Sequence, residues 1–234
     1  MVENKKTSMF KDDLKGEKIV GEFLDMTFYK NAFEHFRRTD NPREQFAGVD
    51  VVVQAKNGKF CKIDEKAQLS MLGNPTPTFA FEVAYLNKDE ELKEGWLFHH
   101  NDTEVYLLGY FNKMNGNPKK LTRKEEIKEF EFVIIAKKTL INFLNSKGYT
   151  EQFLKDETMK LKNLIDNNIA LPEGYSKGKT GYRKILEKGI SVFYTDCLAE
   201  KPLNVVVNRR FLDELAMNVV RITTGNGGKV EIIK

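Results

Sequence analysis

Asp50, Asp64 and Lys66 are the residues of this sequence whose types and spacing could do chemistry. Two carboxylates held a few ångströms apart repel each other, and burying them costs several kcal/mol unless a cation lies between them. A hard divalent ion that prefers oxygen ligands, Mg²⁺ or Mn²⁺, is the natural occupant of such a place. The ammonium group of Lys66 could then orient a water molecule or stabilise the charge that develops on a phosphoryl group under attack.

A predicted β-hairpin would bring these three side chains together. The runs Val49 to Ala55 and Phe60 to Lys66 are strand-like, and they flank Asn57-Gly58, a dipeptide typical of a type I′ turn. Asp50 and Asp64 lie about equally far from this turn, so we expect them to be near neighbours across the two strands. Asp64 and Lys66 are two positions apart and should share one face of the second strand.

A purely structural role is the alternative for each of these charges. Asp50 could cap the entrance of a strand, and Asp64, Glu65 and Lys66 could form a solvated edge, which is the usual fate of charged residues. The set as a whole favours a site, because a hairpin gains no stability from carboxylates that converge.

The same residues resemble a known signature. Asp50 followed by Asp64-Glu65-Lys66 is similar to the motif of the PD-(D/E)XK nuclease superfamily, which has restriction-endonuclease-like and Holliday-resolvase-like members. Asp64 matches the D/E position, Glu65 the variable position and Lys66 the lysine. The leading proline is absent, and Gly48-Val49-Asp50 resembles instead the G-x-D variant of the motif.

The resemblance implies further site residues outside the motif. An acidic residue on the first helix completes the site in that superfamily, and Glu17 in the stretch Leu14 to Leu24 matches it, with Glu22 as the competing choice. The main-chain carbonyl of Glu65 would add a metal ligand. Gln68, two positions beyond the lysine, would help to place DNA or water.

The predicted elements alternate between helices and strands. Apolar residues follow the helical period from Leu14 to Tyr29, which predicts a first helix there. Further strands are predicted at 79–86, 96–98, 104–111, 130–136, 190–196 and 203–208, and helices at 139–147, 151–167 and 210–218. The fold class expected is therefore mixed α/β (α+β), with a restriction-endonuclease-like mixed sheet flanked by helices and a C-terminal α/β extension.

A polar, basic stretch from Asn112 to Glu126 is punctuated by glycine and proline and reads as a linker. We therefore expect a nuclease-like core over residues 1–115, most of which the resemblance covers, and a C-terminal α/β region over residues 116–234. The chain has 234 residues, of which 41% are hydrophobic and 31% charged. It is long enough for one large or two small domains with a buried core.

Two basic stretches could contact phosphates. Both Asn31 to Phe46 and Pro172 to Lys184 are predicted to be loops, and a plain solvated loop is the alternative for each. The candidate contacts are Arg37, Arg38 and Arg43 in the first stretch and Lys177, Lys179, Arg183 and Lys184 in the second. The net charge of +4 is compatible with a nucleic-acid partner but does not show one.

The other residues that often signal function do not point to a second site. His99-His100 precede Asn101-Asp102 in a predicted turn, and no second histidine cluster supports a metal site there. Cys61 and Cys197 lack metal-ligand spacing, which suits buried thiols in a reducing compartment. No cationic leader and no apolar run of about 18 residues is present, so no membrane contact is expected and a cytoplasmic location is predicted.

Together these features predict a metal-dependent nuclease that hydrolyses phosphodiester bonds of DNA. Asp50, Asp64 and Glu17 would bind Mg²⁺ or Mn²⁺, and Lys66 would position the attacking water. The alternative is a catalytically silent nuclease-fold protein that binds nucleic acid or assists assembly in a phage or mobile element. The sequence leaves open endonuclease against exonuclease, DNA against RNA, and whether the chain forms a homodimer.

Overall fold

The predicted hairpin is present in the computed structural model of the chain. The structure describes residues 10–87, 89, 91–199, 201–225 and 228–234. Strand β2 (Val51–Gln54) pairs antiparallel with β3 (Phe60–Ala67), and Val51 lies opposite Ile63. This register places the next positions, Asp50 and Asp64, at the same end of the hairpin, as predicted from their distances to the turn.

The turn of this hairpin is not the type I′ turn that the sequence suggested. Type I′ needs a positive φ at both central residues, whereas only Gly58, with φ +78°, has one in this turn. The main-chain N–H of Gly58 donates to the carbonyl of Ala55 at 2.8 Å, and that of Ala55 donates to the carbonyl of Lys59 at 2.8 Å. The loop therefore has three residues, with the glycine in the bulge position.

The hairpin belongs to a mixed sheet with the strand order β1-β2-β3-β6-β7-β12-β13 among the described residues. The added strands are β1 (Phe36–Arg38), β6 (Val105–Met114), β7 (Ile127–Ala136), β12 (Asn218–Thr223) and β13 (Lys229–Ile232). Strands β3 and β6 run parallel, and all other neighbours run antiparallel. The sheet curves into a half-barrel, so the prediction of a mixed α+β fold is confirmed.

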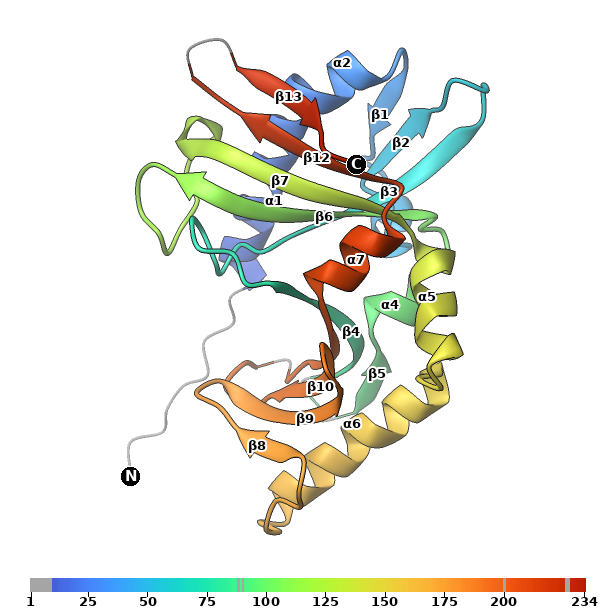
Figure 1. The fold of residues 1–234 in the computed structure, drawn as a ribbon, viewed down its shortest axis with the longest axis vertical. Coiled ribbons are helices and arrows are strands. Elements are labelled where there is room, and N and C mark those ends of the chain that lie inside the picture. The colour runs from blue at the N-terminus through green and yellow to red at the C-terminus, as the bar shows by residue number, and fades with distance from the viewer. Residues whose placement is uncertain (1–9, 88, 90, 200, 226–227) are drawn as a thin grey trace. The chain divides into compact units, whose positions relative to one another are not determined.

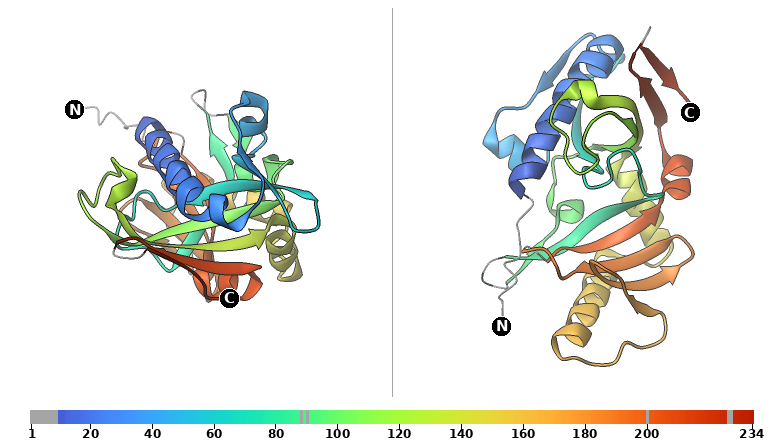
Figure 2. Two further views of the ribbon diagram at one scale, coloured as in Figure 1. Left: turned by 90° about the horizontal axis from the view of Figure 1, so that it is seen from above. Right: turned by 90° about the vertical axis from the view of Figure 1, so that its left-hand side faces the viewer.

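A helical layer covers one face of this sheet (Figures 1 and 2). It consists of α1 (Phe10–Leu24), a π-helical turn η1 (Asp25–Tyr29) and α2 (Lys30–Ala32), which together match the predicted first helix. Phe23 and Leu24 are buried against strand residues such as Leu107 and Phe130. Each large apolar side chain buried in this way contributes about 1.5–3 kcal/mol, so this core fixes where α1 presents its other face.

A second sheet is antiparallel throughout and has the order β5-β4-β11-β10-β9-β8 in the described part of the chain. Its strands are β4 (Thr78–Leu86), β5 (Leu92–Glu94), β8 (Tyr175–Lys177), β9 (Gly181–Glu187), β10 (Ile190–Thr195) and β11 (Leu203–Asn208). Helix α6 (Glu151–Asp166) packs on it through the buried Leu154 and Leu161.

The chain divides into two compact units, and neither is a continuous stretch. The seven-stranded unit contains Phe10–Pro77, His100–Leu140 and Arg210–Lys234, and the six-stranded unit contains Thr78–His99 and Ile141–Arg209. The sequence suggested a simple division at residue 115, which falls inside the seven-stranded unit. Among the described residues the chain changes unit at four places: after Pro77, after His99, within α5 (Lys137–Ser146) and within α7 (Arg209–Leu215).

One predicted strand is a helix. Trp96–Phe98 lies in α4 (Trp96–His99), where the N–H groups of Phe98 and His99 both donate to the carbonyl of Gly95, at 3.2 and 3.0 Å. A short apolar run fits a buried strand or a buried helical turn equally well, so the pattern alone could not choose.

Four other predictions need correction. The expected loop at Asn31 to Phe46 contains β1 and α3 (Pro42–Phe46), and the expected loop at Pro172 to Lys184 contains β8 and the start of β9. The expected linker begins inside β6 and ends in a 3-10 turn, η2 (Lys124–Glu126). Helix α7 ends at Leu215, and the chain continues as β12 and β13, which the sequence did not suggest.

No helix in the described ranges is long and apolar enough to span a bilayer.

Gly109→Ala tests the packing beside the hairpin. An added Cβ at this position of β6 would lie 2.3 Å from Cζ of Phe130 and 3.3 Å from Cβ of Ala67. The crowded ring must move, so we expect a loss of about 1–3 kcal/mol in the free energy of unfolding, measured by urea denaturation. Gly178→Ala is the control, because its Cβ would meet only an ordinary contact at 3.6 Å. Equal stability of the two variants would contradict this account of the packing.

Candidate functional site

A cavity of about 540 Å³ lies between α1 and the strands β1 and β3, within the seven-stranded unit. Its charged and polar lining includes Glu17, Arg38, Asp50, Glu65, Lys66 and His100. Five of these six residues were predicted as site or substrate-contacting residues, and the structure brings them to one place. The apolar remainder of the lining, such as Leu14 and Leu107, belongs to the helix and the sheet floor.

Asp64 is not part of the cavity lining itself, and it is buried with only 1% of its surface exposed. The ammonium of Lys66 donates to its Oδ1, and Nδ1 of His100 lies 3.2 Å from its Oδ2. Burial alone would raise the pKa of Asp64, but the charge and hydrogen bonds of Lys66 and His100 outweigh that effect and lower it. The carboxylate is therefore ionised and has a partner on each oxygen.

Asp50 approaches the same strand from the other arm of the hairpin. Its Oδ2 accepts a hydrogen bond of 2.8 Å from the main-chain N–H of Glu65. Burial raises the pKa of Asp50 to about 7, and the negative charges of Asp64 and Glu65 add to the rise while Lys66 opposes it. Near neutral pH, Asp50 therefore exchanges a proton easily, unlike Asp64.

Lys66 is the positive charge that these carboxylates share. Burial would lower the pKa of its ammonium group, but Asp64, Asp50 and Glu17 outweigh burial and raise it. The group stays protonated throughout the physiological range. A protonated lysine only donates hydrogen bonds, so it can contact phosphate oxygens or water but cannot ligate a metal.

The helix carboxylate that faces this charge is Glu17, not Glu22. Glu17 lines the cavity although it is an exposed residue of α1. Partial desolvation raises the pKa of Glu17, Lys66 opposes the rise, and Asp13 and Asp64 add to it. Glu22 is exposed and does not line the cavity. Of the two alternatives left open by the sequence, only Glu17 is placed to act with Lys66.

Arg38 has a structural role at the wall of the cavity. Its guanidinium donates to Asp25 at 2.7 and 3.0 Å and to Oε2 of Glu65 at 2.7 Å, and it also donates to the carbonyl of Gly21 at 3.1 Å. Gly21 allows this approach, because a Cβ there would lie 2.9 Å from Cζ of Arg38. The predicted phosphate contact is thus an ion-pair tie between the π-helical turn and β3. Such π-helical turns are frequent at functional sites.

Three other predicted contacts lie outside the cavity lining. Arg37 donates to both oxygens of Glu44, at 2.8 and 3.0 Å, and with Thr39 it holds the pKa of Glu44 at about 2. Arg43 is exposed on α3. Gln68 exchanges hydrogen bonds of 3.0 and 3.1 Å with Thr76, so in this arrangement its amide closes the loop after β3 and does not face the cavity.

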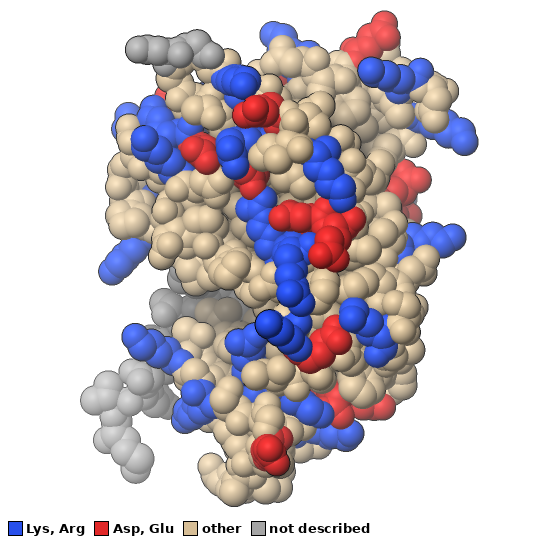
Figure 3. All heavy atoms as spheres, viewed as in Figure 1, with Lys and Arg blue, Asp and Glu red and all other residues tan. Residues whose placement is uncertain are grey.

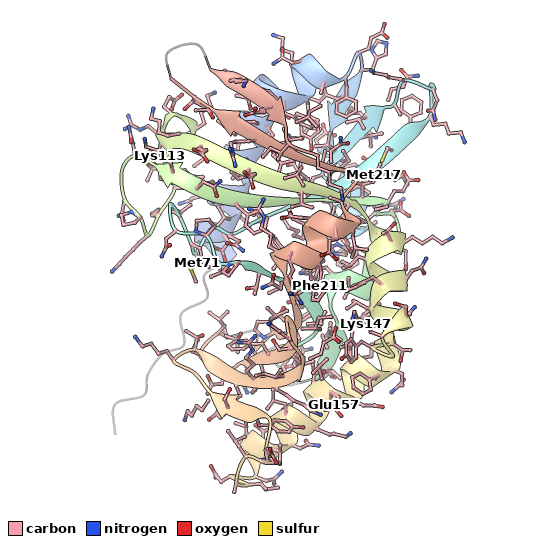
Figure 4. All side chains as sticks on the ribbon, viewed as in Figure 1. Met71, Lys113, Lys147, Glu157, Phe211 and Met217 are labelled. Carbon is pink, nitrogen blue, oxygen red and sulfur yellow. The ribbon has the colours of Figure 1, made fainter. Side chains whose placement is uncertain are left out.

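The predicted lysine-rich loop is an ordered hairpin of the six-stranded unit. Tyr175 lies opposite Lys184 and Lys177 opposite Tyr182, and each lysine ammonium is 5.2 Å from the centre of the partner ring. Lys184 also binds Glu157, a buried residue of α6 labelled in Figure 4. Arg183 is on the opposite face of β9, where its Nε donates to Ser191 at 3.0 Å.

These basic residues therefore do not form one uniform surface. Lys177 and Lys179 are exposed, whereas Lys184 is held by Glu157. On the face drawn in Figure 3, basic side chains are interspersed with acidic ones and leave no broad field of a single sign. A phosphate-binding role is accordingly most suited to the exposed lysines of the hairpin.

The sequence did not identify His100 as a site residue, because His100 lies in a predicted turn. Its imidazole lies against Gly48, where an added Cβ would be 2.2 Å from Nδ1, and Gly48 has φ +79°. Gly48 belongs to the G-x-D stretch, so the glycine was the one signal in the sequence that something must approach the chain closely beside Asp50. It did not reveal that the approaching group is a histidine some fifty positions away.

The donor set suits a hard divalent ion in its chemistry. Asp50, Asp64 and Glu17 each interact electrostatically with Lys66, and oxygen ligands such as their carboxylates are what Mg²⁺ and Mn²⁺ prefer. As the side chains lie, no three Asp, Glu, His or Cys residues of the described ranges are grouped closely enough to form a ready metal centre. Both Asp64 oxygens already have partners, so a metal would compete with Lys66 for this carboxylate.

Asp50→Asn tests the raised pKa of Asp50 through the pH dependence of stability. A folded-state pKa of about 7 against the ordinary aspartate value of 3.8 means that the folded chain holds this proton more tightly than the unfolded chain. The stabilisation is complete below about pH 4 and is lost as the pH rises to about 7. Relative to the Asn variant, the wild type should lose up to about 4 kcal/mol over this window.

Urea denaturation between pH 4 and pH 8 in the presence of a chelator measures this difference. Asp40→Asn is the control, because Asp40 is exposed and does not itself line the cavity. Its pH dependence should match that of the wild type. If Asp50→Asn also matches the wild type, the carboxyl of Asp50 titrates normally and the account of its burial is wrong.

Comparison with known proteins adds no relative to this description. No protein-family model, curated protein or solved structure gives a significant match to the chain. The resemblance to the PD-(D/E)XK superfamily therefore stays a prediction from the motif residues, and function has to be argued from the geometry of the cavity.

Proposed function

We propose that this chain is a metal-dependent nuclease that hydrolyses phosphodiester bonds of DNA. The observation that supports the proposal is that Asp50, Lys66 and Glu17 line one cavity, while the buried Asp64 accepts a hydrogen bond from Lys66. Replacing a buried ion pair by apolar side chains is often neutral or stabilising, so stability alone does not account for several carboxylates around one lysine. Phosphoryl transfer accounts for both charge signs, because it needs acidic ligands and a cationic group near the reacting phosphorus.

Each residue has a role in this proposal. Asp50 and Asp64 would hold Mg²⁺ or Mn²⁺, together with Glu17 and the main-chain carbonyl of Glu65. The ion would polarise a phosphoryl oxygen and lower the pKa of bound water. The ammonium of Lys66 would orient the attacking water or stabilise charge on the phosphate. Arg38 would keep β3 in place through Glu65.

The finer fold assignment is also part of the proposal. The hairpin of β2 and β3, the parallel neighbour β6 and the helix α1 across the sheet fit a restriction-endonuclease-like core. The additional strands β12 and β13 and the six-stranded unit would be additions to that core, of a type suited to substrate recognition.

A second function has one observation in its favour. Because His100 and Lys66 take both oxygens of Asp64, the site as described resembles a closed ion-pair cluster. That arrangement favours a catalytically silent module that binds nucleic acid or assists assembly. Metal binding separates the two functions, since only the nuclease needs it.

Asp64→Asn and Lys66→Met test the nuclease directly. Both should abolish or strongly reduce Mg²⁺- or Mn²⁺-dependent cleavage of plasmid and oligonucleotide DNA. In the wild type the metal should raise the thermal midpoint, since an ion at a hundred times its Kd stabilises by about 2.7 kcal/mol. Asp64→Asn should lose this rise. Lys66→Met should keep or increase it, because the removed ammonium repels a cation.

The matched controls are Asp102→Asn and Lys62→Met. These residues form an exposed ion pair of 2.9 Å in the same unit, and Lys62 is on β3 like Lys66. Exposed pairs contribute at most about 1 kcal/mol, so cleavage and the metal-induced rise should be unchanged. A wild-type protein that shows neither metal-induced stabilisation nor cleavage would favour the silent module.

Lys177→Ala and Lys179→Ala test the substrate surface. If each lysine contacts one phosphate, each loss should weaken binding to all sequences and flatten the log-log salt dependence by about 0.7 to 0.9. Fluorescence anisotropy with single- and double-stranded oligonucleotides gives the affinity and the slope of its salt dependence. The salt range is about 50 to 200 mM. Arg183→Ala, on the opposite face of the same hairpin, should leave the slope unchanged. If the slope of each of the three variants equals that of the wild type, the hairpin is not part of the binding surface.

A further inference from the structure

The two oxygens of the buried Asp64 have different neighbours, and both neighbours, Lys66 and His100, line the cavity. Oδ1 accepts from Lys66, which lines the cavity together with Asp50 and Glu17. Oδ2 lies 3.2 Å from Nδ1 of His100. An ionised carboxylate only accepts hydrogen bonds, so this contact requires a proton on Nδ1 of the imidazole. A carboxylate held through both oxygens by different donors has one orientation.

The imidazole is itself held from several sides. Gly48 leaves just enough room for it, since any Cβ there would lie 2.2 Å from Nδ1 and 2.4 Å from Cγ of His100. Thr103 fixes Gly48 by donating from its buried hydroxyl to the Gly48 carbonyl at 2.7 Å. Lys137, which is 8% exposed, donates from its ammonium to the main-chain carbonyl of His100 at 2.6 Å.

The contacts that hold His100 cost free energy that a residue of a plain surface turn would not require. Burying an ammonium group is unfavourable unless it makes strong hydrogen bonds, and here one of them goes to the backbone of His100. A glycine with positive φ and a buried threonine hydroxyl are further restrictions on the same few residues. All of them converge on the position of one ring, and that ring contacts Asp64.

We propose that His100 is a positioning residue of the candidate metal site. Its imidazole holds Oδ2 of Asp64 and thereby directs Oδ1 toward Lys66, where a divalent cation would bind. This inference rests on the proposed nuclease function and adds to it a residue outside the motif. Removing a group that orients a metal-binding carboxylate typically lowers metal affinity or activity by about 10- to 100-fold. We expect an effect of that size when His100 is removed.

Three substitutions of His100 separate positioning from simple packing. In His100→Asn the amide nitrogen takes roughly the place of Nδ1 and can still donate to Asp64. In His100→Gln the amide nitrogen takes roughly the place of Nε2, one bond further out, and it loses that donor position. His100→Ala removes the ring altogether. His35→Ala is the control, because His35 is exposed and belongs to the same unit.

Calorimetric titration of the chelator-treated full chain with Mn²⁺ is the decisive measurement, with cleavage as a second readout. His100→Ala and His100→Gln should bind Mn²⁺ about 10- to 100-fold more weakly than the wild type. His100→Asn should recover most of the affinity, and His35→Ala should equal the wild type. A packing role would instead make Asn no better than Gln, and that result would overturn the proposal.

A spectroscopic measurement covers the case in which the variants fold poorly. Nitrogen-15 NMR of the imidazole in the wild-type protein should show the Nδ1 of His100 protonated and sensitive to Asp64→Asn, whereas an Nδ1 without a proton would overturn the inference. The two proposals also fail differently. Normal Mn²⁺ binding by His100→Ala would overturn the role of His100 alone, while absence of Mn²⁺ binding in the wild type would overturn the proposed function and this inference together.

Discussion

The site depends on one buried ammonium group. Lys66 lies among Asp64, Asp50 and Glu17, and without it the fully buried Asp64 would keep only its contact with His100, a loss that costs several kcal/mol. Asp64 and Asp50 respond to it differently. Asp64 contacts Lys66 directly and stays ionised, whereas the pKa of Asp50 rises to about 7 because one ammonium cannot neutralise every carboxylate around it. The charge of the cluster therefore changes near neutral pH by way of Asp50.

Keeping such a cluster together places demands on the surrounding backbone. The hydrogen bond from the Glu65 N–H to Asp50 joins the two arms of the hairpin at their open end, far from the turn. Arg38 ties the side chain of Glu65 to the π-helical turn, and Gly21 and Gly48 leave room for Arg38 and His100. These restraints act on the same end of β3, so the orientation of Lys66 and Asp64 is set by the sheet and the helix together.

The sequence revealed the part of this site that local rules control. The spacing of Asp50, Asp64 and Lys66 around one turn defines which residues share an end and a face of a hairpin, and the apolar period of the first helix brought Glu17 into consideration. His100 could not be found in this way, because it reaches Asp64 only through the parallel pairing of β3 with β6, which no local pattern encodes. Arg38 was recognised as important but for the wrong reason, since its carboxylate partners Asp25 and Glu65 lie far from it in sequence. The same limit explains why Lys184 was expected in a flexible loop although it binds Glu157 on α6.

The charge balance also bears on the choice between enzyme and binding module. An ammonium and a divalent cation satisfy the same carboxylates, so in the proposed function Lys66 and the metal compete for Oδ1 of Asp64. Because Asp50 holds a proton up to about pH 7, a cation that enters must displace it, and metal binding should release protons near neutral pH. His100 stays outside this competition, because it keeps its contact with Oδ2 whichever cation occupies Oδ1. In the proposed function this matters, because a metal ligand has to keep one orientation while the cation beside it changes.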